Sequence, residues 1–575
     1  MNRRNIERTA RRLAAARGDI PSDLLITGGQ VINVFDCFIE SIAVAVFDGF
    51  IVGLGDYPAR RTIDLDGAYL TPGFIEAHIH IESSKLTPLR FSEVVVPRGT
   101  TTVVADPHEI ANVRGVEGIR YMLDCARRSP LDVFFMLPSC VPATDMETSG
   151  AALGADDLAP LLAEPDILGI GEVMNFPGAY SGDPNVLTKI ALAGSNLPID
   201  GHSPGLGGKN LAAYLAAGPS TDHECTTLDE AREKLKRGMR VMIREGSTAK
   251  NLTALIPLVT PLTERRMLFV SDDRRPGDLI AQGHLDYILR RAVGLGLDPV
   301  VAVRMVTLNA AETYRLHDRG AIRPGAVADL VALEDLSTFR VSRVWKLGAE
   351  IARDGGMVGE SPSSEPFPHS GRLPVPPLSL GALAVPDRGG SVRVIEIIQN
   401  QIATKVATEI LPVRDGFLCS DPARNIAKLA VIERHTGNGG MSVAFVKGLG
   451  IERGAIASTV AHDSHNIIVA GVDDKSMLTA VGHLTDIGGG QVAVEGGKVI
   501  AELALPVAGL MSERPAVEVA DDERRLIDSA RSLGCTSEDP FMVLSFLALP
   551  VIPELKLTDR GLVDVARFKI VSLYA

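Results

Sequence analysis

The chain has 575 residues, 46% of them hydrophobic and 22% charged, a globular balance that excludes a fibrous or largely disordered protein. Lys and Arg number 58 against 71 Asp and Glu, a formal net charge of −13, so we expect no nucleic-acid partner, since such proteins need a basic surface. No stretch reaches the ~18 uninterrupted apolar residues of a membrane span, and the six cysteines are scattered without paired spacing, as in a reduced protein. These features predict a soluble cytoplasmic protein with a small-molecule ligand and no membrane partner.

The N-terminal part of the chain predicts a helix followed by a small β-domain. Residues 1–20 are rich in Arg and Ala, and residues 21–72 contain short Val- and Ile-rich runs separated by Gly and Asp-Gly turns, which are hairpin signals. A matching pattern returns at residues 320–360. We therefore expect residues 21–72 and 320–360 to form one composite β-sandwich domain.

Residues 73–319 alternate short apolar strands with helix-like segments. The runs TTVVAD, ILGIGEV and MLFVSDD each end in polar or charged residues. This alternation predicts a TIM-like (β/α)8 barrel, in which the chemistry lies at the carboxyl ends of the strands. A doubly wound open sheet is the main alternative, but no Gly-rich phosphate fingerprint follows the first strand.

Beyond the barrel, composition predicts a linker and a further domain. Residues 361–390 are rich in Pro and Ser, which is typical of a linker. Residues 391–575 mix helical and strand patterns, and we expect them to form a separate C-terminal α+β domain.

Histidines and carboxylates follow several of the predicted barrel strands. His78 and His80 are two residues apart, so on a strand both side chains share one face and can reach one metal ion. Four further candidates each end another strand in the same way. Nitrogen and oxygen ligands without a thiolate suit Zn, Mn or Fe. The predicted metal ligands are His78, His80, Glu172, His202, His223 and Asp272.

Such a ligand set has a chemical consequence. A carboxylate that spans two ions would create a binuclear centre, which makes hydroxide available near neutral pH. The two carboxylates contribute a charge of −2, so two divalent ions would leave a positive site able to hold hydroxide. The set therefore predicts a hydrolase.

Several segments carry a resemblance to a known family. PGFIEAHIHIESS, DGHSPGL and FVSDDR resemble the amidohydrolase superfamily, and TTVVADPHEIANV, GIGEVMN, STDHEC, MIREGS and the C-terminal TVAHDSHNIIVAGVDD extend the resemblance to the bacterial adenine deaminases over nearly the whole chain. The resemblance implies hydrolysis of adenine to hypoxanthine and ammonia with two divalent metal ions per chain. It implies Mn²⁺ or Fe²⁺, with Zn²⁺ as the alternative, and a homo-oligomer such as a dimer.

The resemblance also implies how the ligands divide between two ions. The more buried ion belongs to His78, His80 and Asp272, the second ion to His202 and His223, and the bridging position to Glu172. Many binuclear relatives bridge with a carboxylated lysine, but ILGIGEVMN contains no lysine. This departure counts against the cyclic-amide hydrolysis of hydantoinases and dihydroorotases.

A mechanism follows from these implied roles. Hydroxide would attack C6 of adenine, and Asp272 would take its proton and deliver it to the departing amine as general base and then acid. The ring nitrogen N1 must gain a proton at the same time. Glu224 is the predicted donor, with Asp106, His108 and Glu245 as alternatives.

Two neighbouring motifs each allow two interpretations. Asp106 and His108 contact the substrate or support a ligand, or they mark a helix start with Asp106 as the cap and Pro107 at the first helical position. Arg244 and Glu245 contact the substrate or form an ion pair at the rim of the barrel.

His462 and His465 in the C-terminal AHDSHN segment form a further motif. Together with Asp463 they allow a second metal site, yet no fourth ligand is evident. A loop that closes over the barrel mouth, or a polar turn, is the favoured interpretation.

Two other functions remain open at this point. One is an amidohydrolase that acts on a different aminopurine or heterocycle or opens a cyclic amide. The other is a metal-free barrel that serves as a scaffold and not as an enzyme. All six predicted ligand positions are filled, whereas a scaffold would be expected to have lost some of them.

Overall fold

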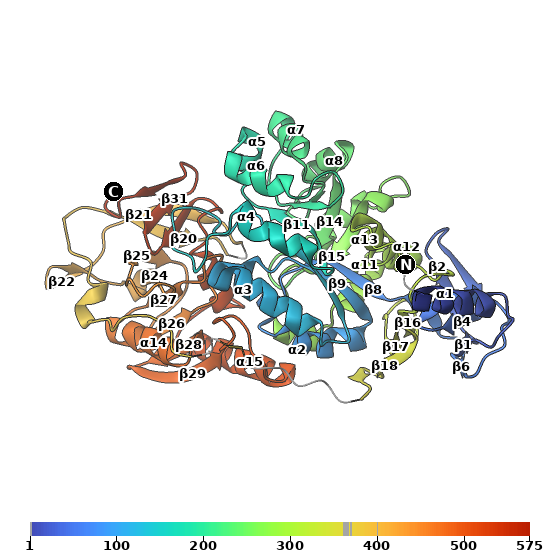
Figure 1. The fold of residues 1–575 in the computed structure, drawn as a ribbon. Coiled ribbons are helices and arrows are strands. Elements are labelled where there is room, and N and C mark those ends of the chain that lie inside the picture. The colour runs from blue at the N-terminus through green and yellow to red at the C-terminus, as the bar shows by residue number, and fades with distance from the viewer. Residues whose placement is uncertain (1–2, 360–366, 369–370, 400) are drawn as a thin grey trace.

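The computed structural model describes residues 3–359, 367–368, 371–399 and 401–575. Figure 1 shows three regions: a β-rich region around the N-terminus, a central barrel, and a C-terminal region on the opposite side of the barrel. Helix α1 (Arg3–Ala16) opens the chain. Arg12 of α1 lies 2.9 Å from a carboxylate oxygen of Asp48, which attaches the helix to the first sheet.

Two sheets form the β-rich region. The first has the order β5 (Phe50–Leu54), β4 (Val44–Phe47), β1 (Leu24–Thr27) and β6 (Thr62–Asp64). The second has the order β19 (Gly356–Met357), β18 (Ala349–Arg353), β17 (Val341–Lys346), β16 (Leu330–Leu333), β7 (Tyr69–Pro72), β2 (Gln30–Asn33) and β3 (Phe38–Ser41).

The second sheet joins segments from both sides of the barrel. Strand β16 pairs antiparallel with β7, with Leu330 opposite Pro72 and Leu333 opposite Tyr69. Alternating apolar residues of both segments enclose one core that includes the fully buried Trp345. The core therefore forms only when the two flanks of the barrel come together.

Eight parallel strands follow between residues 74 and 270. They are β8 (Phe74–Ile79), β9 (Thr100–Ala105), β10 (Asp132–Leu137), β11 (Ile167–Val173), β12 (Ile199–Gly201), β13 (Thr221–Asp222), β14 (Arg240–Arg244) and β15 (Met267–Val270). Most are buried along their whole length, as expected for parallel strands covered by helices.

The first and last of these strands meet and close the barrel. The backbone N–H of Asp272 donates to the carbonyl of His78 at 3.1 Å, and that of His80 donates to the carbonyl of Asp272 at 3.4 Å. The TIM-like barrel predicted from the sequence is thereby confirmed. Closure also brings residues 78–80 and residue 272 to the same end of the barrel.

Helices connect the strands and cover the barrel (Figure 1). They are α2 (Pro88–Val95), α3 (His108–Ala126), α4 (Ala155–Leu158), α5 (Phe176–Ser181), α6 (Pro184–Ala191), α7 (Gly208–Ala217), α8 (Leu228–Lys236), α9 (Leu252–Leu255), α10 (Pro276–Ala281), α11 (Leu285–Gly294), α12 (Pro299–Met305) and α13 (Leu308–Thr313). Side-chain caps begin several of them: Asn175 precedes α5, Thr227 precedes α8 and Asp298 precedes α12, each satisfying an otherwise unpaired backbone N–H.

The C-terminal region is built on an eight-stranded sheet. Its order is β21 (Thr404–Glu409), β20 (Val392–Ile397), β25 (Met441–Lys447), β24 (Ile426–Ile432), β27 (Ile467–Gly471), β26 (Ala455–Ser458), β28 (Gly490–Glu495) and β29 (Lys498–Ala504). A hairpin of β22 (Val413–Arg414) and β23 (Phe417–Leu418) and a small sheet of β30 (Leu555–Thr558), β31 (Gly561–Asp564) and β32 (Lys569–Val571) accompany it. Helices α14 (Asp474–Asp486), α15 (Ala516–Ser532) and α16 (Pro540–Phe546) complete the predicted α+β arrangement.

Part of the segment predicted as a linker, residues 361–390, packs against the C-terminal region. Residues 361–366 and 369–370 lie outside the described residues. Farther along, Leu373, Val375 and Leu383 are buried in a core that includes residues of α14, and the N–H of Leu373 donates to the carbonyl of Thr485 at 2.9 Å. Apolar residues among the prolines thus attach this stretch to the C-terminal region.

Ion pairs join the C-terminal region to the barrel. Lys85 lies 2.5 Å from Glu523, with both side chains 5% exposed, and Arg275 lies 2.9 Å from Asp539. Helix α10 of the barrel also packs against α15. Among the described helices, none combines the length and the apolar composition that a membrane crossing needs.

Candidate functional site

The barrel brings the six predicted ligands to one end. His78 lies in β8 and Glu172 in β11, and the other four follow the ends of β8, β12, β13 and β15 directly or within two residues. Five of the six are no more than 4% exposed, and the His202 side chain is 15% exposed. The site is therefore nearly enclosed, with His202 at its more open side.

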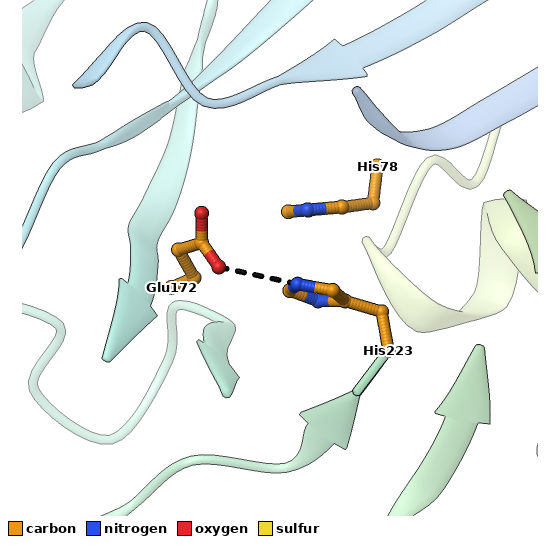
Figure 2. Close-up of side chains that lie close together, drawn as sticks. All are labelled: His78, Glu172 and His223. Atoms are coloured by element: carbon orange, nitrogen blue, oxygen red, sulfur yellow. Dashed lines mark ion pairs between the residues drawn. The ribbon is translucent and has the colours of Figure 1, made fainter. Parts of the chain in front are cut away.

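Glu172 occupies the centre of this group. Its Oε1 lies 3.2 Å from Nε2 of His80, whereas its Oε2 lies 2.8 Å from Nδ1 of His202 and 3.2 Å from Nε2 of His223. Figure 2 shows the carboxylate beside the stacked rings of His78 and His223, whose centroids are 4.0 Å apart. Two oxygens directed at different histidines are the arrangement that a bridging carboxylate requires.

Asp272 contacts the two histidines of the first barrel strand segment, His78 and His80. Its Oδ1 lies 3.3 Å from Nε2 of His80 and 3.6 Å from Nε2 of His78. The residue has a positive φ of 55°, a conformation that costs an ordinary side chain roughly 1–3 kcal/mol and occurs mostly at functional positions. The barrel-closing hydrogen bonds hold it in place.

The donor set fits divalent metal ions. His78, His80 and Asp272 each offer a ligand atom within 4.8 Å of the others, as do His78, Glu172 and His223. Nε2 of His78 is buried without a hydrogen-bond partner among the described residues, which is costly unless another ligand binds it. Imidazole and carboxylate donors suit Zn, Mn and Fe.

Electrostatics favours cation binding at the two carboxylates. Burial raises the pKa of Glu172, but hydrogen bonds from His202, His223 and His80 outweigh it and hold that pKa well below its usual range. Burial likewise raises the pKa of Asp272, but the Arg244 guanidinium and the contacts with His78 and His80 together outweigh it and hold that pKa well below its usual range. Both groups are therefore anionic near neutral pH.

Arg244 joins two carboxylates at the edge of the site. Its Nη1 lies 2.8 Å from Oδ2 of Asp272, and its Nη2 donates to Oε2 of Glu224 at 3.0 Å. Burial raises the pKa of Glu224, but Arg244 and His202 hold it far below its usual value. The prediction that Glu224 donates a proton to N1 is therefore not supported, because an ion-paired carboxylate has no proton to give.

Asp106 and His108 lie beside Glu172. The backbone N–H of Glu172 donates to Oδ2 of Asp106 at 2.9 Å, and the Asp106 carbonyl lies 3.0 Å from Nδ1 of His80. Helix α3 begins after Pro107 without a side-chain cap, so the capping interpretation of Asp106 is wrong. Nδ1 of His108 lies 3.4 Å from Oε1 of Glu172.

Glu245 lies outside this group. Its Oε1 is 2.7 Å from Nη1 of Arg291, and its Oε2 accepts from the backbone N–H of Leu252 at 3.2 Å. Of the two interpretations, the ion pair at the rim is the one observed, with Arg291 as the partner. A substrate contact by Glu245 is not supported.

The sequence interpretation missed two residues near the site. Glu109 lies between His108 and the C-terminal histidines, with Oε1 at 2.7 Å from Nδ1 of His462. Lys234 is fully buried and pairs with Asp222, the residue before His223. Glu109 could have been noticed as the acidic residue that follows His108, whereas Lys234 lies in a charged helical segment that predicts a solvent-exposed position.

Comparisons with known proteins cover nearly the whole chain. The model of the amidohydrolase family matches residues 69–351, and that of the adenine deaminase C-terminal domain matches residues 401–569. A protein named adenine deaminase from Desulfatibacillum aliphaticivorans is 48% identical over 98% of this chain and 99% of its own. One of the same name from Methanothrix thermoacetophila is 46% identical over 98% of this chain and 99% of its own. A solved β-aspartyl dipeptidase from Fervidobacterium islandicum AW-1 superposes with a TM-score of 0.47 at 16% identity over 59% of this chain and 99% of its own.

Proposed function

The chain belongs to the adenine deaminase family of amidohydrolases, and on that premise we propose that its barrel site hydrolyses adenine to hypoxanthine and ammonia with two divalent metal ions. The observation that carries the proposal is the position of Glu172, whose two oxygens face separate histidines. A C-terminal region of the adenine deaminase type distinguishes the chain from ring-opening amidohydrolases.

The proposed ligands divide as the two oxygens of Glu172 suggest. His78, His80 and Asp272 would hold one ion, His202 and His223 the other, and Glu172 both. When bound, such a pair of ions makes hydroxide available near neutral pH. Mn²⁺ or Fe²⁺ is the proposed occupant, with Zn²⁺ as the alternative, because nitrogen and oxygen donors accept all three.

Asp272 carries the proton in the proposed reaction. As water adds to C6 of adenine, Oδ1 of Asp272 accepts the proton and later passes it to the departing amine, which leaves as ammonia. Arg244, bonded to Oδ2, keeps the other oxygen directed at the site. Water is consumed: one of its protons leaves with the amine as ammonia, the other restores the proton that the donor residue gives to N1, and the C6–N bond is replaced by the C6–O bond of hypoxanthine.

His108 replaces Glu224 as the proposed donor to the ring nitrogen. Its Nδ1 is buried without a hydrogen-bond partner among the described residues and lies beside Glu172. Glu224 remains an anion next to Arg244 and accepts hydrogen bonds instead. Asp106 accepts the backbone N–H of Glu172 at Oδ2, and its Oδ1 lies 3.5 Å from Nδ1 of His108, so we assign Asp106 to the support of His108 and keep His108 as the proposed donor.

Ammonia release from adenine tests the proposal directly. Protein prepared separately with Mn²⁺, Fe²⁺ and Zn²⁺ would be assayed on adenine, guanine, cytosine, adenosine and dihydroorotate, with metal counted on the same samples. We expect turnover of adenine alone with two ions per chain. If the protein binds two ions but turns over another substrate, that substrate replaces adenine in the proposal. If it binds no metal and turns over none of the substrates, the scaffold interpretation is favoured.

The assembly and the compartment are also proposals. We infer a homodimer in the cytoplasm, supported by the resemblance to the family and by six cysteines that are all free thiols. Sedimentation velocity at several concentrations tests the assembly, and a single species with the mass of one chain would contradict it.

A further inference from the structure

The loop between β26 and β27 reaches from the C-terminal region to the barrel helix α3. Nδ1 of His462 lies 2.7 Å from Oε1 of Glu109, and Nε2 of His465 contacts Oε2 of the same carboxylate. The three side chains are between 1% and 5% exposed. Both oxygens of one buried barrel carboxylate are therefore occupied by histidines from another part of the chain.

The contacts of His465 identify which of its nitrogens carries hydrogen. The backbone N–H of Ala461 donates to Nδ1 of His465 at 3.1 Å, so Nδ1 acts as an acceptor. In a neutral imidazole the other nitrogen is then the donor, and burial lowers the pKa of His465 to about 4. Nε2–H of His465 thus donates to Glu109, a role that is incompatible with binding a metal ion through the same nitrogen.

Other residues fix the loop. Arg434 donates through Nε to the carbonyl of His465 and through Nη2 to the carbonyl of Ala508 at 2.9 Å. The Asn466 amide donates to the carbonyl of Thr148 at 2.8 Å. The ring of His462 stacks on Phe546 with 4.7 Å between centroids. The two histidines are therefore held in defined orientations.

Glu109 connects this loop with the site. Its Oε1 lies 3.6 Å from Nε2 of His108, and Nδ1 of His108 lies 3.4 Å from Oε1 of Glu172. The sequence of contacts thus leads from His462 through Glu109 and His108 to the proposed bridging carboxylate.

We propose that His462 and His465 are positioning residues of the active site: they fix the Glu109 carboxylate, and Glu109 orients His108 toward the substrate. The C-terminal region thereby fixes the carboxylate on the Nε2 side of His108, whereas Nδ1 of His108 lies 3.5 Å from Oδ1 of Asp106 and 3.4 Å from Oε1 of Glu172 within the barrel. This inference rests on the proposed function for its activity readout, but the contact itself can be tested without activity.

A third metal ion is the competing interpretation of the same residues, because Glu109, His462 and His465 offer ligand atoms within 4.8 Å of one another. The donor role of His465 argues against it. Metal counting distinguishes the two: positioning predicts two ions per chain in the wild type and in every variant of this loop, whereas a third ion that disappears in His465→Asn would overturn the proposal.

Amide replacements test the geometry at each histidine. A glutamine amide can mimic Nε2–H and an asparagine amide can mimic Nδ1–H. His465 uses Nε2 and His462 uses Nδ1, so opposite replacements should rescue the two positions. We expect His465→Gln and His462→Asn to retain most of the activity, and His465→Asn and His462→Gln to lose about 10- to 100-fold in kcat/KM, as for residues that orient ligands.

The control is His483, which pairs with Glu502 at the surface of the same region with 27% and 47% exposed side chains. His483→Gln and His483→Asn should both retain wild-type activity. The contrary result is that the kcat/KM values of the variants at 462 and 465 follow side-chain size or the loss of thermal stability, and not which imidazole nitrogen the amide mimics. In that case the role of the two histidines is structural and the positioning proposal is wrong.

Coupling to Glu109 provides the second activity test. In a Glu109→Gln background, His465→Asn should have little further effect, because residues that act through one contact are not additive. Full additivity of the two losses would overturn the proposal.

Hydrogen exchange tests the contact independently of the substrate. Amide exchange of residues 459–466 in the metal-loaded full chain should accelerate in Glu109→Gln and remain unchanged in Glu502→Gln. Unchanged exchange in Glu109→Gln would reject the proposed positioning contact between Glu109 and the two histidines, even if the protein deaminates adenine. Faster exchange in this variant, with no turnover of adenine by the wild type, would retain the contact and reject the proposed function.

Discussion

Nζ of Lys234 lies 2.9 Å from Oδ2 of Asp222, and neither side chain has exposed surface. Oδ1 of Asp222 accepts from both the backbone N–H and the hydroxyl of Ser203 at 2.8 Å. Because Ser203 follows His202 and Asp222 precedes His223, this one carboxylate joins the two segments that carry the proposed ligands of the second ion.

Replacing Lys234 with Met should destabilise the fold and weaken the second ion. The change leaves Asp222 as an unpaired buried charge, and breaking such a pair typically costs about 3–5 kcal/mol. Urea unfolding measures the loss, and metal counting after dialysis should show one ion retained and one depleted. Lys236→Met, at an exposed position of the same helix, is the control, and equal effects of the two changes would exclude the proposed role of the pair.

Glu172→Ala should remove both metal and activity. The substitution deletes the only described side chain that contacts His80, His202 and His223 together, so neither ion would keep its shared ligand. Metal content by elemental analysis and ammonia release would be measured on the same sample. Two tightly held ions in Glu172→Ala would show that another residue bridges, with His108 and Asp106 the nearest to examine.

Asp272→Asn should stop turnover while much of the metal remains. The amide keeps an oxygen that can act as a ligand, but it cannot accept the proton that the proposed mechanism gives to Oδ1. We expect kcat to fall by about 10²–10⁴-fold, the usual contribution of a general base, with KM nearly unchanged. A variant that deaminates adenine at the wild-type rate would remove Asp272 from the proton transfer.

The barrel and the six clustered residues could be predicted because both depend on local patterns. Alternation of apolar runs with helical segments indicates parallel strands, and the carboxyl ends of such strands meet at one end of a barrel. His78 and Glu172 could therefore be expected to lie together although they are far apart in sequence. In the structure, ligand atoms of His78 and Glu172 lie within 4.8 Å of each other, and Glu172 also contacts His80 and His223.

The partners of individual charges could not be predicted in the same way. Glu224 follows a candidate ligand and was expected to donate a proton, but Arg244 from the next strand pairs with it. Glu245 follows Arg244 in sequence yet pairs with Arg291 of α11. Such pairings depend on how helices pack over the strand ends, and local periodicity contains no information about that packing.

Contacts between the barrel and the C-terminal region could not be predicted from the sequence for a related reason. For His462 and His465 the sequence offered Asp463 of the same segment as a possible co-ligand, whereas the partner that both contact is Glu109, more than 350 residues away. Leu373 and Val375 occur among prolines whose composition predicts a linker, but they fill a core. Only the folded arrangement shows that these segments meet.

The buried Lys556 should make stability depend on pH in the alkaline range. Its side chain is 0% exposed, and Nζ donates to the carbonyls of Ile402 and Phe546 at 2.8 and 2.9 Å. Burial lowers the pKa of Lys556 from 10.5 to about 7. A neutral amine has two hydrogens, which is sufficient for both carbonyls.

The sign of the effect follows from the two pKa values. Between pH 7 and about 10.4, the usual lysine pKa, the unfolded chain binds a proton that the folded chain does not, so the free energy of unfolding rises with pH. The slope from this group is at most about 1.4 kcal/mol per pH unit. Urea unfolding of the wild type and Lys556→Met at pH 6, 7, 8 and 9 should show a stability difference that shifts in favour of the wild type as the pH rises. Lys498→Met, at an exposed position, should instead stay parallel to the wild type, and a Lys556→Met curve that is also parallel would mean that the folded protein keeps Lys556 charged.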